Sequence, residues 1–403
     1  MKNRKSLTLF ASVLVAGGVL AGCNTSTEKA EEKPAAEEQV EETEAEEETQ
    51  EEATTEQATA AEEIKAFQDI KAQTEKSKEG QEVDWEQVST LYNDHLKTAV
   101  NQLNGEYDQA IEAAISGGQS GELEALIAHQ LIDKTTQAYF YQKQKRLHQD
   151  VIAALEAKDT DAANASFEEL KAVVNDIIVP TAEKRDGYYE LTGEASLVEN
   201  INNGLKTQEE ALANNDVDSY KIYTQLTDKS VYRSYYLAAN SYAEKIEAAV
   251  KEGKEEIELQ NMQAEAWGFL QAIKESLSGG DEAAATRLNE LFTLNTTNPA
   301  DIKADEVNSL FVKAIVGKVK SYHEKAPVEL DNGNVTEAQV KALEGNMFLK
   351  AIEIQGKEKL GEEKYAETMK QAEAWFNAIA ENNKEEAATQ SEQILMTLET
   401  LTK

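Results

Sequence analysis

The helical character of this chain is clearest in residues 85–100, which read WEQVSTLYNDHLKTAV. Apolar side chains recur there at steps of three and four residues, so they share one face of an α-helix; they are Trp85, Val88, Leu91, Tyr92, Leu96 and Val100. The same periodicity continues to the end of the chain, whose 403 residues include only four prolines. Glycine clusters separate the long tracts rich in Ala, Leu, Glu and Lys. The sequence predicts an all-α fold.

The apolar stripe recurs 219 residues further along the chain. The matched pairs are Val88 and Val307, Leu91 and Leu310, Tyr92 and Phe311, Leu96 and Ile315, and Val100 and Val319. A shorter match joins residues 264–267 to residues 372–375, because both read AEAW. These matches indicate an internal duplication of the chain.

Four stretches combine an apolar-faced helix with a polar turn and a second helix. Two of them are residues 147–173 and 197–226, and the other two contain Trp267 and Trp375. Asp and Asn in such turns can cap the helix that follows, which is typical of antiparallel helical hairpins. We predict two related helical bundles, over residues 81–230 and 231–403, with a break near residues 227–231.

The N-terminus has the layout of a secretory signal. Basic residues are followed by an uncharged stretch, residues 6–22, and then by Cys23, the only cysteine of the chain. The alternative, an uncleaved membrane helix, needs about 20 apolar residues. The stretch Leu20-Ala21-Gly22-Cys23 resembles the end of the bacterial lipoprotein signal. The resemblance implies that residues 1–22 are removed and that Cys23 carries an N-terminal lipid, which anchors the protein to the extracytoplasmic face of the cell membrane.

An acidic stretch follows the cysteine. Sixteen Glu and two Lys occur between Glu28 and Glu63, with little that is large and apolar. We therefore expect residues 23–80 to be a disordered tether, of a reach that suits a Gram-positive wall, although Ile64, Phe67 and Ile70 give its end an amphipathic pattern. The formal net charge of the whole chain is -36, which excludes nucleic acid as a partner and favours cations and basic partners.

One pair of residues has a spacing that suits a metal site. His129 and Asp133 stand four residues apart and so on one helix face, where both could reach a divalent ion, with His148 or Glu124 as a further ligand. The alternative is an ordinary polar pair on a wet surface. No strong metal-binding motif is present, and no cofactor is identified.

Tyrosine is unusually frequent, with fourteen copies. Tyr232, Tyr235 and Tyr236 share one helix face and could line a cleft for a flat ligand or a peptide. Arg233 or Lys143 could hold an acidic group of such a ligand. The alternative is that these tyrosines pack between helices.

Signatures of catalysis are missing from the sequence, so we expect a protein that is not an enzyme. An all-helical, duplicated lipoprotein resembles in architecture the imelysin-type lipoproteins that assist iron uptake, but their Gly-x-His-x-x-Glu stretch is absent, and no functional residue carries over. The favoured hypothesis is a surface protein that binds a solute, a cation or a partner protein, with a membrane transporter or an envelope protein as its partner. The alternative is a structural scaffold of the cell wall.

Overall fold

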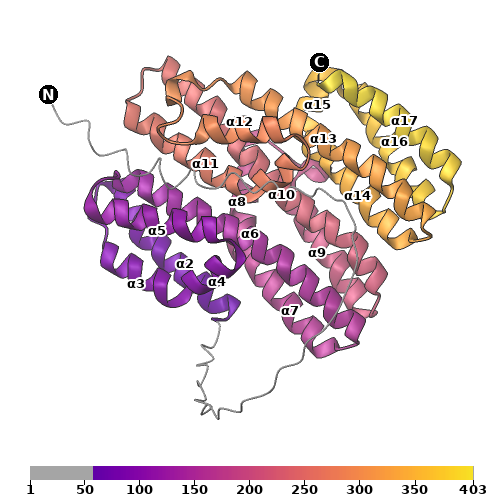
Figure 1. Cartoon of the computed structure of the whole chain (residues 1–403), viewed down its shortest axis with the longest axis horizontal. Helices are drawn as coiled ribbons and strands as arrows, with labels where there is room; N and C mark the ends of the chain where they lie inside the picture. The colour runs from indigo at the N-terminus through magenta and orange to yellow at the C-terminus, as the bar shows by residue number, and fades with distance from the viewer. Residues whose placement is uncertain (1–57, 403) are drawn as a thin grey trace, which may run out of the picture.

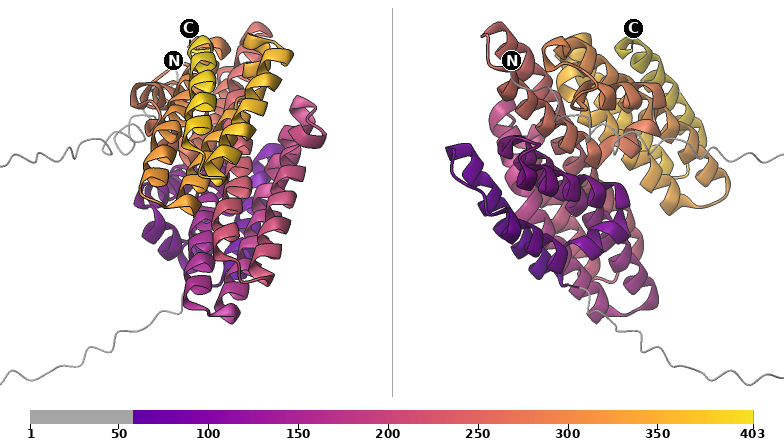
Figure 2. Two further views of the ribbon diagram at one scale, coloured as in Figure 1. Left: turned by 90° about the vertical axis from the view of Figure 1, so that its right-hand side faces the viewer. Right: turned by 60° about the vertical axis from the view of Figure 1, so that its left-hand side comes forward.

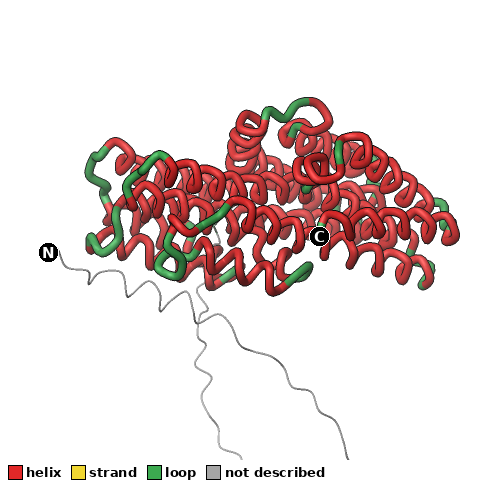
Figure 3. The backbone as a smooth tube through the Cα atoms, turned by 90° about the horizontal axis from the view of Figure 1, so that it is seen from above, coloured by secondary structure: helices red, strands yellow, loops and turns green. Residues whose placement is uncertain are grey.

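A computed structural model describes residues 58–402, and this part of the chain is helical with no β-strand (Figures 1 and 3). The all-α prediction is confirmed. Cys23, the signal and most of the predicted tether lie outside the described residues. Within the described range, no helix is long and apolar enough to cross a membrane.

The helices succeed one another with short connections. In chain order they are α2 (Ala60–Thr74), α3 (Trp85–His95), α4 (Lys97–Leu103), α5 (Gly105–Ser120), α6 (Ala125–Ala157), α7 (Thr160–Val173), α8 (Val179–Tyr189), α9 (Leu197–Ala213), α10 (Val217–Lys251), α11 (Glu256–Ser278), α12 (Glu282–Phe292), α13 (Ala304–Asp331), α14 (Val335–Ala351), α15 (Glu353–Leu360), α16 (Glu362–Ala380) and α17 (Lys384–Leu401). A 3₁₀-helix, η1 (Glu75–Glu79), follows α2, and a π-helical turn, η2 (Val174–Ile178), joins α7 to α8.

All four predicted hairpins are present. They pair α6 with α7, α9 with α10, α11 with α12, and α16 with α17. Each second helix begins at an Asp or Asn whose side chain accepts a hydrogen bond from a backbone N–H of the first turn, as expected for an N-cap; these residues are Asp159, Asp216, Asp281 and Asn383. In the left view of Figure 2, most helices accordingly lie side by side with their axes roughly aligned.

The predicted division into residues 81–230 and 231–403 is wrong, because α10 passes through the boundary without a break. Residues 227–241 of this helix are all buried. It packs against α6, α8, α9, α11, α13 and α14, and so lies between the N-terminal and C-terminal helices (Figure 1). One contiguous hydrophobic core extends on both sides of it.

The predicted disordered tether is also too long, because α2 begins at Ala60. Thr59 and Glu62 form a reciprocal capping box at its start. Phe67 is buried against the ring of Phe140 on α6, at 5.6 Å between centroids. Glu63 is also buried, and it accepts hydrogen bonds from Tyr139 Oη at 2.7 Å and Lys143 Nζ at 2.5 Å. These contacts hold α2 on the folded part.

Three buried histidines make the stability depend on pH. Burial lowers the pKa of His129 and His148 to about 4 and that of His323 to about 3. An imidazole in the unfolded chain has a pKa of about 6.5, so between these values the unfolded chain binds protons that the folded protein excludes. Protonation therefore favours unfolding, and stability falls as the pH falls from about 6.5 toward 4.

We expect a loss of about 2 kcal/mol for each of these histidines between pH 7 and pH 4.5, which urea unfolding at several pH values would measure. His323→Gln should flatten the profile because it removes one of the three groups. The control is His95→Gln at an exposed position, which should leave the slope unchanged. A free energy of unfolding that stays constant between pH 7 and pH 4.5 would contradict this expectation.

Candidate functional site

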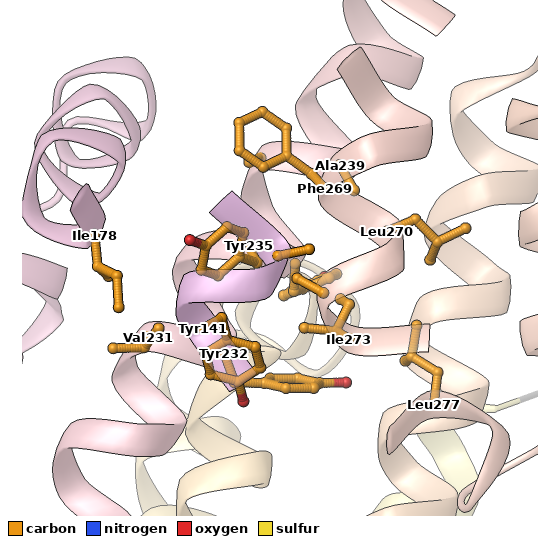
Figure 4. Packing of buried hydrophobic residues seen from close by; sticks show 14 of the residues in the cluster. Tyr141, Ile178, Val231, Tyr232, Tyr235, Ala239, Phe269, Leu270, Ile273 and Leu277 are labelled. Carbon is orange, nitrogen blue, oxygen red and sulfur yellow. The ribbon is translucent and has the colours of Figure 1, made fainter. Parts of the chain in front are cut away.

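The three tyrosines of α10 lie in the core rather than in a cleft. The exposed fractions of Tyr232, Tyr235 and Tyr236 are 1%, 0% and 0%. Their rings pack on Phe348 of α14, Phe269 of α11 and Phe311 of α13, at centroid distances of 4.9, 5.9 and 5.1 Å. Figure 4 shows Tyr232 and Tyr235 among the apolar side chains of neighbouring helices. The prediction that these tyrosines line a cleft is wrong, because they pack between helices.

The two basic side chains that were predicted to assist the tyrosines in binding a ligand form ion pairs within the protein instead. Arg233 forms an ion pair with Glu353 at 3.0 Å, and Lys143 forms one with Glu63 at 2.5 Å. Both side chains are mostly buried in these pairs. They tie α10 to α15 and α6 to α2 respectively.

The predicted metal pair is buried in α6. His129 Nδ1 lies 2.8 Å from Thr74 Oγ1, while the carboxylate of Asp133 contacts the ammonium of Lys134 and accepts a hydrogen bond from Gln137 Nε2 at 3.0 Å. Among residues 58–402, no group of three His, Cys, Asp or Glu side chains is placed to hold a metal ion. The pair is not on a wet surface either. Asp133 serves instead to neutralise Lys134 in the core.

A pocket of about 310 Å³ opens beside this pair, between α2, α6, α8, α10 and α11. We call it the cationic pocket, because its lining includes five basic side chains, Lys71, Lys78, Lys134, Lys184 and Arg185. The only carboxylates in the lining are Asp176 and Glu265, and Glu265 accepts a hydrogen bond from the hydroxyl of Tyr242. Two of the five pair closely with carboxylates outside the lining, Lys78 with Glu75 at 2.9 Å and Lys134 with Asp133. Lys184 and Arg185 form no ion pair with a described residue.

Lys134 stands on the α6 wall of the cationic pocket and is 8% exposed. Burial alone would lower its pKa, but the adjacent Asp133 carboxylate outweighs burial and raises the pKa above its usual value. Gly268 of α11 fits against it, since a Cβ atom there would lie 2.3 Å from Lys134 Cβ. The close approach of α11 to α6 at this glycine fixes one wall of the pocket.

Arg185 and Lys184 come from α8, which is held in place by two hydrogen bonds. Thr181 Oγ1 donates to Gln137 Oε1 on α6 at 2.9 Å, and Arg185 Nη1 donates to Ser241 Oγ on α10 at 2.5 Å. Arg185 is 6% exposed, and its buried Nε has no hydrogen-bond partner. Leaving a buried donor without an acceptor costs free energy. This N–H is therefore free to donate a hydrogen bond to a bound ligand.

Lys184 forms no ion pair with any residue of the described range. Burial lowers its pKa, and the positive charges of Lys134 and Lys71 lower it further. Lys71 itself is only loosely paired, with its Nζ 3.9 Å from Asp133 Oδ1. The ammonium groups on three different helices thus repel one another, and an anion placed between them would relieve that repulsion.

The remaining lining adds a polar floor and apolar walls. Gln130 is 3% exposed and its Oε1 has no hydrogen-bond partner. Phe67, Ile177 and Phe269 supply apolar surface. A few convergent polar groups among apolar ones are typical of a site for a small molecule.

None of the residues predicted from the sequence to bind a ligand or a metal lines this pocket, although one repeated motif points to it. Residues 130–134 read QLIDK, and residues 225–229, 95 positions later, read QLTDK. The first copy contributes Gln130 and Lys134 to the cationic pocket. Comparisons of the chain with known protein families, curated proteins and solved structures found no match.

Proposed function

We propose that this protein is a lipid-anchored, extracytoplasmic binding protein whose cationic pocket takes up a small anionic solute. The observation that carries the proposal is the placement of Lys184 and Arg185 in the pocket without a carboxylate partner in the described part of the chain. A positive charge that the fold does not neutralise is suited to neutralisation by a ligand.

The chemistry of the pocket favours an oxyanion over a cation. A guanidinium presents its N–H groups in a planar fork that matches carboxylate and phosphate groups, while a lysine acts as a point charge beside it. Each hydrogen bond to a charged group contributes about 1.5–3 kcal/mol. The volume of about 310 Å³ suits a metabolite rather than a macromolecule. We expect a small carboxylate or phosphate compound.

The location outside the cell is a separate part of the proposal. It is supported by the Leu20-Ala21-Gly22-Cys23 stretch, which lies outside the described residues. A lipid at Cys23 would keep the pocket near the membrane, where a transporter or another envelope protein could receive the solute. The scaffold of the cell wall stays as the alternative prediction.

Thermal unfolding with a panel of anions would test the pocket. We expect inorganic phosphate, glycerol phosphate, citrate or succinate to raise the Tm of the mature chain, because a ligand that binds only the folded state stabilises it. The variant Lys184→Gln should reduce the shift, while the matched control Lys206→Gln, at an exposed position on α9, should not. No shift with any of these anions, or an equal shift in Lys184→Gln, would count against the proposal.

The anchor has its own test in Cys23→Ser. This change removes the sulfur that would carry the lipid, so we expect the protein to move from the membrane fraction to the culture medium. Metabolic labelling with a radioactive fatty acid should mark the wild-type protein and leave the variant unlabelled. If the variant stays in the membrane fraction, or if the wild type takes up no label, the anchor is wrong, whereas the pocket can still be tested by the anion panel.

A further inference from the structure

A second pocket, of about 530 Å³, lies between α6, α10 and α14, away from the residues of the cationic pocket. It is built on the second copy of the repeated motif, because Gln225, Asp228 and Lys229 are part of its lining. We propose that this second pocket binds a zwitterionic amino compound, a free amino acid or a short peptide, through its ammonium and its carboxylate together.

The charges of the second pocket differ from those of the first. Four basic side chains line it, and so do four acidic ones; the basic ones are Lys145, Lys221, Lys229 and Lys341, and the acidic ones are Glu156, Asp228, Glu337 and Glu344. Because the numbers of basic and acidic side chains are equal, the lining does not favour a simple anion. Those side chains that do not pair with one another favour a ligand that carries both a positive and a negative charge.

The deepest charged groups leave a surplus of negative charge. Lys229 Nζ lies 2.5 Å from Asp228 Oδ2 and 2.9 Å from Glu344 Oε1, so two carboxylates share one ammonium. Burial opposes the ionisation of Asp228, yet Lys229 and the more distant Lys145 hold its pKa at about 2. Both carboxylates are therefore ionised at neutral pH, since the pKa of Glu344 is also lowered.

Three buried polar atoms of the residues that line the second pocket have no hydrogen-bond partner. They are His148 Nε2, Gln225 Oε1 and Asp228 Oδ1. His148 is 1% exposed and neutral at pH 7, since burial lowers its pKa to about 4, and its other nitrogen lies 3.4 Å from the hydroxyl of Tyr220. An amide oxygen can only accept, so the missing partner of Gln225 Oε1 is a donor. An ammonium offers three such donors beside the surplus carboxylate.

The carboxylate of the ligand has partners in the same pocket. Lys145 and Lys341 form no ion pair with any described residue, whereas Lys221 is neutralised by Glu156 at 2.6 Å. Both unpaired lysines are more exposed than the pocket floor. Ile152 and Val340 add apolar surface for a side chain. The ammonium would thus point inward and the carboxylate outward.

Titration calorimetry of the mature chain with leucine and with leucyl-leucine would test this inference. At least one of the two should bind. Acetylation of the ligand's amino group, or conversion of its carboxylate to an amide, should each weaken binding by tenfold or more, because each removes one of the two charges. An absence of heat with both probes, or equal binding of the acetylated compound, would overturn the inference.

Substitutions in each pocket show which of the two binds the amino compound. Lys341 lies on a partly exposed face of α14, so the variant Lys341→Gln should fold normally. We expect this variant to bind the ligand about tenfold more weakly. The control Lys370→Gln, at an exposed position on α16, should bind as the wild type does. Lys184→Gln in the cationic pocket should also leave this binding unchanged, which separates the two sites. Unaltered affinity in Lys341→Gln would contradict the inference even if leucine binds.

Discussion

Gly317→Ala is expected to lower the free energy of unfolding by about 3 kcal/mol, at the upper end of what overpacking a core usually costs. Gly317 lies on α13, at the point where the turn between α11 and α12 packs against this helix. A Cβ atom at Gly317 would lie 2.1 Å from the carbonyl oxygen of Gly280, and one at Gly280 would lie 2.0 Å from the carbonyl oxygen of Ala314. These neighbours are backbone atoms, so the strain cannot be relieved by a side-chain rotation.

The control for this substitution is Gly187→Ala. Gly187 lies within α8, and nothing is within 4 Å of the position of its Cβ atom. Alanine there should therefore stabilise the protein by about 0.5–1 kcal/mol, as it does in exposed helix interiors. Urea unfolding of both variants measures the difference. Equal stability of Gly317→Ala and the wild type would show that the turn between α11 and α12 does not approach α13 as closely as described.

Arg185→Gln is expected to weaken the binding of an anion in the cationic pocket about 100-fold. The variant loses a buried charge and the donor groups of a side chain that lines the pocket, and two charge-assisted hydrogen bonds together contribute about 3 kcal/mol or more. Calorimetric titration with the anion that gives the largest thermal shift measures the effect. Arg185→Lys should be intermediate, because it keeps the charge without the fork.

Arg185 also donates a hydrogen bond to Ser241, so Arg185→Gln changes the packing of α8 on α10 as well as the pocket. A second variant separates these two causes of a lower affinity. The variant Ser241→Ala removes that bond and leaves the guanidinium in the pocket. If it lowers stability but keeps most of the affinity, the role of Arg185 is in binding. An Arg185→Gln protein that binds the anion as tightly as the wild type would rule out the pocket as its site.

Much of the fold could be predicted from local patterns, but the continuity of α10 could not. The predicted break near residues 227–231 falls on a part of this helix that contains the polar residues Thr227, Asp228 and Ser230. In the structure Thr227 Oγ1 donates to Gln208 Oε1 at 3.2 Å, and Ser230 Oγ donates to the carbonyl of Leu226 at 2.7 Å. Asp228 pairs with Lys229 through its Oδ2. Gly204 allows α9 to approach Thr227 closely. Such contacts depend on tertiary packing, which a local pattern does not record.

The start of the folded part was missed for a similar reason. Glu63 resembles the other glutamates of the acidic stretch, but its partner Lys143 is 80 residues away. A salt bridge between distant positions gives no local signal.

The cationic pocket posed the same difficulty. Lys71, Lys134 and Lys184 belong to α2, α6 and α8, and each resembles an ordinary helix-surface lysine in the sequence. Only folding brings them together. The metal and tyrosine predictions rested on residues that share one helix face. In the structure α6 and α10 are buried nearly all round in their central turns, so such a face packs inside the core.

Binding of an oxyanion in the cationic pocket can be seen in crystals of the protein soaked in selenate, because selenium scatters anomalously. We expect an anomalous peak within hydrogen-bond distance of Arg185 Nε and close to the ammonium groups of Lys134 and Lys184. An anomalous map with no peak in this pocket, at a selenate concentration that labels other sites on the molecule, would contradict it.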